Sequence, residues 1–200
     1  PPRVDDEHEQ ILTHQLELFG LCPREIIMHH SEIIKDKNHA TQLHDWLRED
    51  GSDGKFHLLY RSSGDDLSSK TFHSNCDDKG CTLTIIETTD GYVLGGYSNT
   101  PWASSDRWCT ADKAFLFVLQ GSDVSSPTKM KLKKANDGDA VYHDSSSGPA
   151  FGANHDLYVD GSEVQIACGC SYESGPQVLE GTYSCFVLWC NVIKSNTRFL

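Results

Sequence analysis

CDDKGCTLTIIETTDGYVLGGYSNTPW, the stretch from residue 76 to residue 102, determines the fold class of this chain. It holds two apolar runs, Cys81–Thr88 and Tyr92–Tyr97, whose β-branched and aromatic residues favour strands. Asp90-Gly91 between them is a strong signal for a short hairpin loop. The Gly95-Gly96 pair is unusual inside a strand, where glycine is kept for a bend or for the close approach of another backbone. The stretch therefore predicts a β-hairpin with one tightly packed strand.

The composition describes one domain of ordinary size. The chain has 200 residues, of which 38% are hydrophobic, so it can bury a substantial core. Because it contains no apolar run of about 18 residues, we expect no membrane insertion. The net charge of -12 argues against nucleic acid as a partner. The one basic cluster, at residues 129–134, is interpreted as the solvated face of an edge strand.

The eight cysteines leave two interpretations open. They are either mostly reduced side chains of an intracellular, cytoplasmic protein or the disulfides of a secreted binding sandwich. Neither Cys168-Gly-Cys170 nor Cys185 to Cys190 has the paired spacing of a zinc site. Asn99-Thr100-Pro101 is not a glycosylation acceptor, which favours the intracellular interpretation.

Periodicity predicts three helices. The first covers residues 5–19, and residues 1–30 are expected to be a helical lead-in, either part of the fold or the end of an upstream linker. The second is expected to begin at a cap on Asn38 and to end at Gly51, with an apolar stripe that packs on a sheet. A short third helix has Ser68 as its cap, with Leu67 and Phe72 at the spacing of a hydrophobic staple.

The remaining strands are expected around residues 56–61, 114–119, 129–133, 140–142, 155–159 and 185–193. Many strands punctuated by turns, with few helices, predict a mainly β (α+β) fold. We expect a sandwich of two antiparallel sheets with short flanking helices, occupying residues 31–200.

Several separate motifs give the chain a family resemblance. They are LLYRS at residues 58–62, the stretch 76–102, KAFLF at residues 113–117 and GPAFGANHDLYV at residues 148–159. In this order they resemble the TLDc family, the domain of the oxidation-resistance proteins. The resemblance implies a two-sheet sandwich and no established catalytic mechanism or cofactor. It also implies a structural role for the motif residues Gly95, Gly96, Gly148, Gly152, His155 and Asp156.

The resemblance further implies a function. Members of the family protect against oxidative stress, and several bind and regulate the vacuolar-type proton ATPase. This implies an intracellular, non-enzymatic protein-interaction domain, with the ATPase as the expected partner. The sequence does not indicate an oligomeric state.

Cys76 and His73 are the best candidates for an enzyme, because a thiolate beside an imidazolium is a strong nucleophile. Their spacing puts both on one face of the short helix, and a cysteine-dependent redox or hydrolytic enzyme is therefore the alternative function. A half-buried structural cysteine and a surface histidine are the simpler interpretation.

Two metal sites were weighed and not favoured. The pairs Asp65-Asp66 and Asp77-Asp78 offer oxygen ligands for calcium, but aspartates beside glycine are more often turn formers. His155 and Asp156 would need His143 from another segment to bind a metal ion. We therefore expect no metal.

The two ends of the hairpin, the turn at residues 77–80 and the loop that holds Trp102, are the candidate interaction site. Trp102 is expected to fold back on the core, with a role in binding as the alternative. Tryptophan and arginine often dominate binding energy. The interaction candidates are Asp77, Asp78, Lys79, Trp102, Arg107 and Trp108.

Overall fold

The computed structural model describes residues 31–52, 55–63, 68–134, 138–161, 163–167, 169–176 and 181–194. The expected helix over residues 5–19, Leu67 of the expected staple and the pair Asp65-Asp66 lie outside them. The described part is mainly β and has two helices, α2 (Lys37–Glu49) and α3 (Ser69–Cys76). Its strands are β1 (Lys55–Ser63), β2 (Thr82–Thr88), β3 (Val93–Ser98), β4 (Trp108–Cys109), β5 (Phe115–Gln120), β6 (Thr128–Lys131), β7 (Val141–Tyr142), β8 (Ala150–Phe151), β9 (Leu157–Asp160), β10 (Glu163–Ile166) and β11 (Gly181–Lys194).

The strands form two antiparallel sheets, as the sequence predicts. Sheet I has the order β1-β11-β2-β3-β5-β6, and sheet II has the order β4-β7-β8-β9-β10-β11. The long strand β11 belongs to both, because residues 181–184 pair with β10 while residues 185–192 pair with β2. A bulge between Cys185 and Val187 marks the point where β11 passes from one sheet to the other.

The predicted hairpin of β2 and β3 lies in the middle of sheet I. Thr88 and Tyr92 close its loop through a backbone hydrogen bond of 3.0 Å. A Cβ atom on Gly95 would meet the carbonyl oxygen of Thr84 at 2.0 Å. A Cβ atom on Gly96 would meet the ring of Phe151 at 2.7 Å. The glycine pair therefore lets the neighbouring strand and the facing sheet approach β3.

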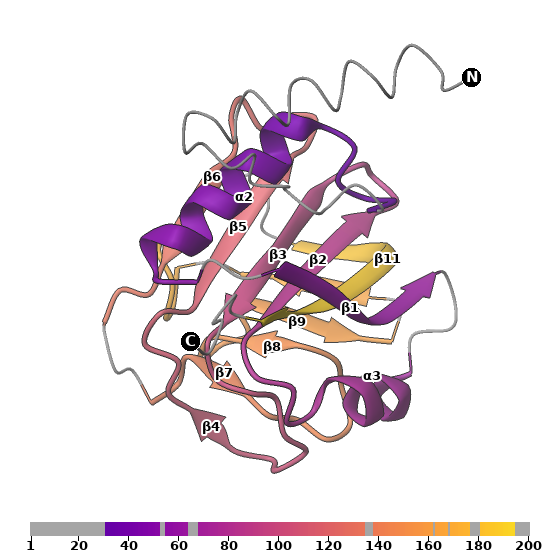
Figure 1. Ribbon diagram of the computed structural model, residues 1–200, viewed down its shortest axis with the longest axis vertical. Coiled ribbons are helices and arrows are strands. Elements are labelled where there is room, and N and C mark those ends of the chain that lie inside the picture. The colour runs from indigo at the N-terminus through magenta and orange to yellow at the C-terminus, as the bar shows by residue number, and fades with distance from the viewer. Residues whose placement is uncertain are drawn as a thin grey trace, which may run out of the picture.

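Two apolar cores make the domain three layers thick. One core lies between the sheets and includes Leu94, Leu116, Phe151 and Leu157. The other lies between sheet I and α2, which lies over β5 in Figure 1. Both faces of sheet I are thus covered over this region, which explains why β2, β3 and β5 are almost continuous runs of buried residues.

Helix α2 has the predicted apolar stripe but a different beginning. Its buried residues are Ala40, Leu43, Trp46 and Leu47. The cap is Asp36 rather than Asn38: the Asp36 carboxylate accepts a hydrogen bond of 2.8 Å from the Asn38 backbone N–H. The prediction was wrong by two residues because both positions carry good cap residues. The helix ends at Glu49, and Gly51, which was predicted to stop it, follows the Asp50 cap with a φ of +81°.

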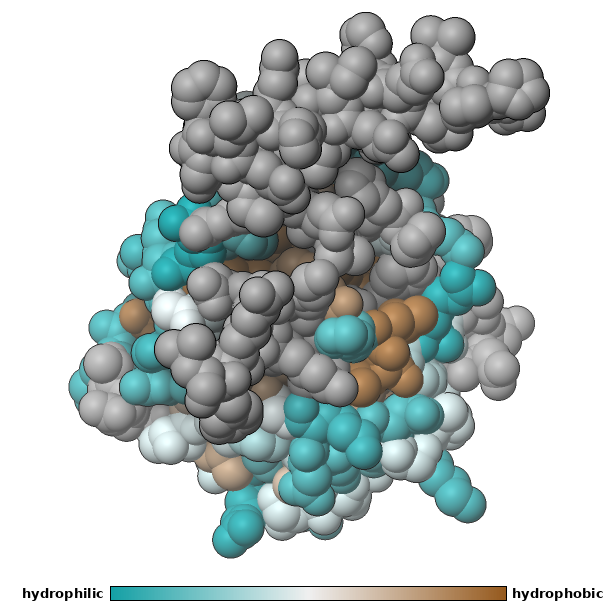
Figure 2. All heavy atoms as spheres, in the orientation of Figure 1, coloured by the Kyte–Doolittle hydropathy of each residue, from teal (hydrophilic) through white to brown (hydrophobic). Residues whose placement is uncertain are grey.

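Strand β1 changes face along its length. Its register against β11 shifts between Leu58 and Tyr60, which is a β-bulge. Before the bulge, Phe56 packs on the core beneath α2, and after it Tyr60 is buried in the core between the sheets. Leu58 remains 51% exposed, and Figure 2 shows apolar surface over this strand. The strand expected around residues 56–61 is present, but its side chains do not alternate regularly between the two faces.

The basic cluster at residues 129–134 lies on the predicted edge strand, since β6 pairs with β5 at one end of sheet I. Lys131, Lys133 and Lys134 are exposed. Lys129 differs, because its side chain is only 6% exposed and its ammonium bonds to Asp50 at 2.6 Å and to the Trp46 carbonyl at 3.1 Å. A cation at the C-terminus of α2 is stabilised by the helix dipole. The expectation of a solvated lysine was wrong here.

Candidate functional site

Helix α3 ends in a polar cluster centred on His73. Ser68 caps the helix as predicted, and the helix delivers His73 to a site where its side chain is 7% exposed. The ring Nδ1 lies 2.8 Å from the Asp77 carboxylate, and Nε2 lies 2.7 Å from the Asp144 carbonyl and 3.0 Å from the Ser147 carbonyl. Each ring nitrogen therefore has an oxygen partner within hydrogen-bond distance. His73 thus ties three segments together.

Cys76 lies on the buried side of α3. It is 0% exposed and belongs to the core between the sheets, next to Phe72 and Trp102. Both nitrogens of His73 are bonded to groups other than Cys76, so the expected nucleophile pair lacks its base. The cysteine that was expected to be half-buried is fully buried, and the histidine that was expected at the surface is buried as well.

Trp102 folds back on the core. It is 1% exposed, and its ring makes edge contacts with Phe72 and Phe151 at centroid distances of 6.0 and 5.4 Å. A ring buried in this way is not available to a partner. It instead joins two loops, because the Asp78 backbone N–H donates a 3.0 Å hydrogen bond to the Trp102 carbonyl.

The other interaction candidates divide into bound and exposed side chains. Asp77 is bound: one carboxylate oxygen faces His73, and the other accepts a 2.7 Å hydrogen bond from the Ser104 hydroxyl. Asp78, Lys79 and Arg107 are exposed. Trp108 is half-buried on β4, which is paired with β7.

Asp156, in the motif GPAFGANHDLYV, is a fully buried carboxylate that binds backbone amides of a neighbouring loop. One of its oxygens accepts the backbone N–H groups of Gly169 and Cys170 at 2.7 and 2.8 Å, and the other accepts that of Ser171 at 2.8 Å. Gly152 stands against this carboxylate with a φ of +80°, and a Cβ atom there would lie 1.9 Å from an Asp156 oxygen. The motif is therefore a buried clamp on the 169–171 loop.

The same geometry argues against the weighed metal sites. The Asp156 oxygens are occupied by amides, while the ring of His155 stacks on Tyr158 at a centroid distance of 4.2 Å. Asp77 is occupied by His73 and Ser104. Within the described residues, no three His, Cys, Asp or Glu side chains are grouped as metal ligands.

His143 is a buried histidine that the sequence marked only as a metal candidate. It is 3% exposed, and its Nδ1 lies 3.6 Å from the Cys109 sulfur. Burial lowers the pKa of His143 below its ordinary value of 6.5, and repulsion by the nearby His73 acts in the same direction. The ring is therefore neutral in the folded protein at neutral pH.

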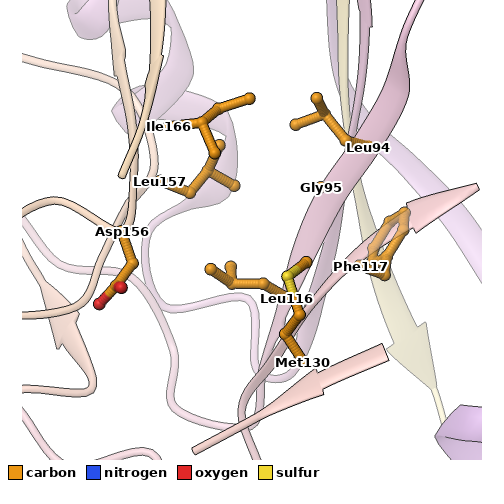
Figure 3. A pocket seen from close by; sticks show the side chains of 8 residues that line it. All are labelled: Leu94, Gly95, Leu116, Phe117, Met130, Asp156, Leu157 and Ile166. Carbon is orange, nitrogen blue, oxygen red and sulfur yellow. The ribbon is translucent and has the colours of Figure 1, made fainter. Parts of the chain in front are cut away.

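The cavity shown in Figure 3 is too small to hold a small-molecule ligand. Eight side chains or backbone positions line it, among them Leu94, Leu116, Met130 and Ile166. Its volume is about 10 Å³, which is the space of one water molecule. The Asp156 carboxylate points away from the apolar side chains there (Figure 3). This cavity is a packing defect between the sheets.

Four aromatic side chains at sheet II form a surface feature that the sequence does not indicate. Trp108, Tyr142, His155 and Tyr158 are half-buried. The ring centroid of Trp108 lies 4.7 Å from that of Tyr142 and 6.4 Å from that of His155, and the His155 ring lies 4.2 Å from Tyr158. Tyr158 could have been recognised from the strand Leu157–Asp160, in which it is the outward-facing aromatic between two buried residues. Tyr142 and Trp108 lie on strands of two residues, which are too short for a periodic signal.

The described part of the chain is thus a two-sheet domain whose chemistry-bearing motif residues hold loops together. The sequence model of the TLDc domain matches residues 28–189, which is most of the chain. The protein belongs to the TLDc family. No curated protein matches the chain.

Two further observations bear on its setting. The side chains of Cys76, Cys81, Cys109 and Cys170 are free thiols. Neither α2 nor α3 is long and apolar enough to cross a membrane.

Proposed function

We propose that this TLDc domain is a non-enzymatic protein-interaction domain that acts in oxidative-stress resistance by binding and regulating the vacuolar-type proton ATPase. Membership of the family supports the class of function. The partner is the one that the family resemblance implies.

The observation that carries the proposal is the junction between the turn after α3 and the loop after β3. Asp77 and Trp102 form a parallel bridge, with the hydrogen bond from Asp78 to Trp102 at 3.0 Å. Buried Trp102 and the bound Asp77 carboxylate fix both segments, while Asp78, Lys79 and Arg107 remain exposed. Loops held on a rigid scaffold with exposed charged side chains are typical of recognition surfaces.

Catalysis by Cys76 has less support. The thiol is buried and His73 is engaged by acceptors on both sides. A nucleophile needs access to substrate and a base within hydrogen-bond reach.

Binding to the purified peripheral sector of the ATPase tests the proposal. We expect the folded 200-residue chain to bind and to change the rate of ATP hydrolysis. Reversing both exposed charges, Lys79→Glu with Arg107→Glu, should weaken binding, because charges at the rim of an interface steer association. Lys131→Glu, at the exposed edge of sheet I, is the matched control and should bind like the parent chain.

A folded parent chain that does not bind the peripheral sector would refute the ATPase as partner. Equal binding by the double variant and the control would refute the placement of the surface. Survival of peroxide-treated cells that express the parent chain or the double variant tests the link to oxidative stress, and equal survival would contradict it.

A further inference from the structure

The outer face of sheet II carries an aromatic row that its strand register creates. Trp108 pairs with Tyr142, Tyr142 with Ala150, and Ala150 with Tyr158. Directly paired residues on neighbouring strands share a face. The alternate positions, among them Val141, Phe151 and Leu157, are buried between the sheets. The row therefore faces away from the core.

His155 completes this row into a platform. Ala150 has no ring to bridge Tyr142 and Tyr158, but the His155 ring lies nearly parallel to Tyr158, at 11° and 4.2 Å, and reaches Trp108 at 6.4 Å. His155 is held there by a left-handed backbone with φ of +57°. We call the four residues Trp108, Tyr142, His155 and Tyr158 the aromatic platform.

Two carboxylates lie near Tyr158 of the platform. An Asp144 oxygen accepts a hydrogen bond of 3.5 Å from the Tyr158 hydroxyl, and Asp160 follows on the same strand and acts electrostatically on Tyr158. Burial acts to raise the pKa of Asp144, but hydrogen bonds from Ser146 and Ser147 outweigh it and leave the pKa below its ordinary value. The platform thus combines aromatic faces with negative charge, in a chain whose net charge is -12.

We propose that the aromatic platform binds arginine side chains of an extended segment of a protein partner. A guanidinium is planar and weakly hydrated, so it stacks on aromatic faces while its edge donates to carboxylates. Lysine offers a compact, strongly hydrated charge without a flat face, and a proline-rich segment would make no use of Asp144 and Asp160. The chemistry of the platform therefore favours arginine.

This inference rests on the proposed function only in that the domain binds proteins. The platform adjoins the candidate loops, since Trp108 follows Arg107 and the Asp144 carbonyl lies 2.7 Å from His73. The peptide assay contains no ATPase, and its variants change platform residues rather than Lys79 and Arg107, so its outcome can be distinguished from that of the pull-down.

The test uses the 200-residue chain and a fluorescent Gly-Ser peptide that carries arginines, with a lysine peptide and a proline-rich peptide as comparisons. We expect saturable binding of the arginine peptide, with binding of the lysine peptide about two-fold to five-fold weaker, the range that a cation–π contact supplies. Binding should weaken as salt increases. The indole N–H resonance of Trp108 should shift on titration.

Variants locate the binding site. Asp144→Asn with Asp160→Asn removes two charges and keeps the acceptor for Ser146, so the fold should persist while arginine binding weakens. Trp108→Ala should weaken binding of the arginine peptide until its affinity equals that of the lysine peptide. Leu58→Ala, at an exposed apolar residue of sheet I, should leave both unchanged.

Equal binding of the arginine and lysine peptides, tighter binding of the proline-rich peptide, or no binding to a folded chain would each overturn the inference. Unchanged binding by the folded Asp144→Asn, Asp160→Asn variant would also overturn it.

Discussion

Replacing Asp156 by asparagine should strongly destabilise the domain. Asparagine has nearly the shape of aspartate but keeps one acceptor oxygen and turns the other oxygen into a donor amide. Its oxygen can serve Gly169 and Cys170, while its amide then faces the Ser171 backbone N–H, which the Asp156 carboxylate accepts at 2.8 Å. The substitution therefore leaves a buried donor facing another donor.

The size of the effect follows from these contacts. A hydrogen bond to a charged group contributes about 1.5–3 kcal/mol, and a buried donor left unsatisfied costs about 1–3 kcal/mol. We therefore expect Asp156→Asn to lower the free energy of unfolding by about 3 kcal/mol, against a typical total of about 5–15 kcal/mol. For a domain of this size, the midpoint of thermal unfolding should fall by roughly 6–12 °C.

Urea unfolding, followed by circular dichroism and tryptophan fluorescence, measures this change. The urea concentration at the midpoint should fall. The slope of the free energy of unfolding against urea concentration should stay the same, because the surface exposed on unfolding does not change. Asp160→Asn, at the exposed end of β9, which begins directly after Asp156, is the control, and its free energy of unfolding should lie within about 0.5 kcal/mol of the parent value. A loss below about 1 kcal/mol for Asp156→Asn would refute the assignment of the carboxylate as a buried clamp.

Three further changes test other parts of the structure. Gly96→Ala puts a Cβ atom 2.7 Å from the Phe151 ring and should cost about 1–3 kcal/mol in urea unfolding, whereas Gly138→Ala, with open space around it, should be nearly neutral. Because burial holds the pKa of His143 below 6.5, the unfolded chain takes up a proton at this histidine before the folded chain does as the pH falls. His143 should thus lower the free energy of unfolding below pH 6.5, by about 1.4 kcal/mol for each pKa unit by which burial lowers its pKa. In urea titrations at a series of pH values, His143→Gln should abolish this loss of stability. Lys129→Met should lower the thermal midpoint by a few degrees, since it leaves Asp50 and the Trp46 carbonyl without their buried cation, and an unchanged midpoint would contradict that role.

The hairpin could be predicted from the sequence because all its signals are local. β-branched residues, the Asp90-Gly91 loop and the glycine pair agree with one another within a single stretch. The reason for Gly95 and Gly96 could not be read locally, because the atoms that exclude a side chain belong to Thr84, Phe117 and Phe151. The sequence indicates that a side chain does not fit at these two positions, but it does not indicate which residues would collide with one.

The contacts of individual polar residues were less predictable. Lys129 and Lys131 are two residues apart on β6 and therefore lie on the same face of the strand. Only Lys129 contacts the end of α2, a helix about 80 residues earlier in the chain. His73 was expected at the surface because its acceptors, the Asp144 and Ser147 carbonyls, come from a distant loop. Such bonds depend on how elements are placed in space, which a single sequence does not encode in any local pattern.

The aromatic platform shows the same limit for a surface. Its four residues come from three separate segments, and two of its strands have only two residues. Register between such short strands is set by the surrounding fold rather than by turn residues. The platform could therefore be recognised only after the sheet was known.

Because β11 belongs to both sheets, it also sets the order in which the domain can form. It is the last of the described strands in the chain, and β1, β2 and β10 all depend on it for a hydrogen-bonded edge. During synthesis, these three edges stay unpaired until β11 leaves the ribosome, and unpaired edges invite pairing with other chains. The partner contact of β1 spans more than 120 residues of sequence, so folding should be slow. We therefore expect aggregation during synthesis to be most severe before β11 pairs with both sheets.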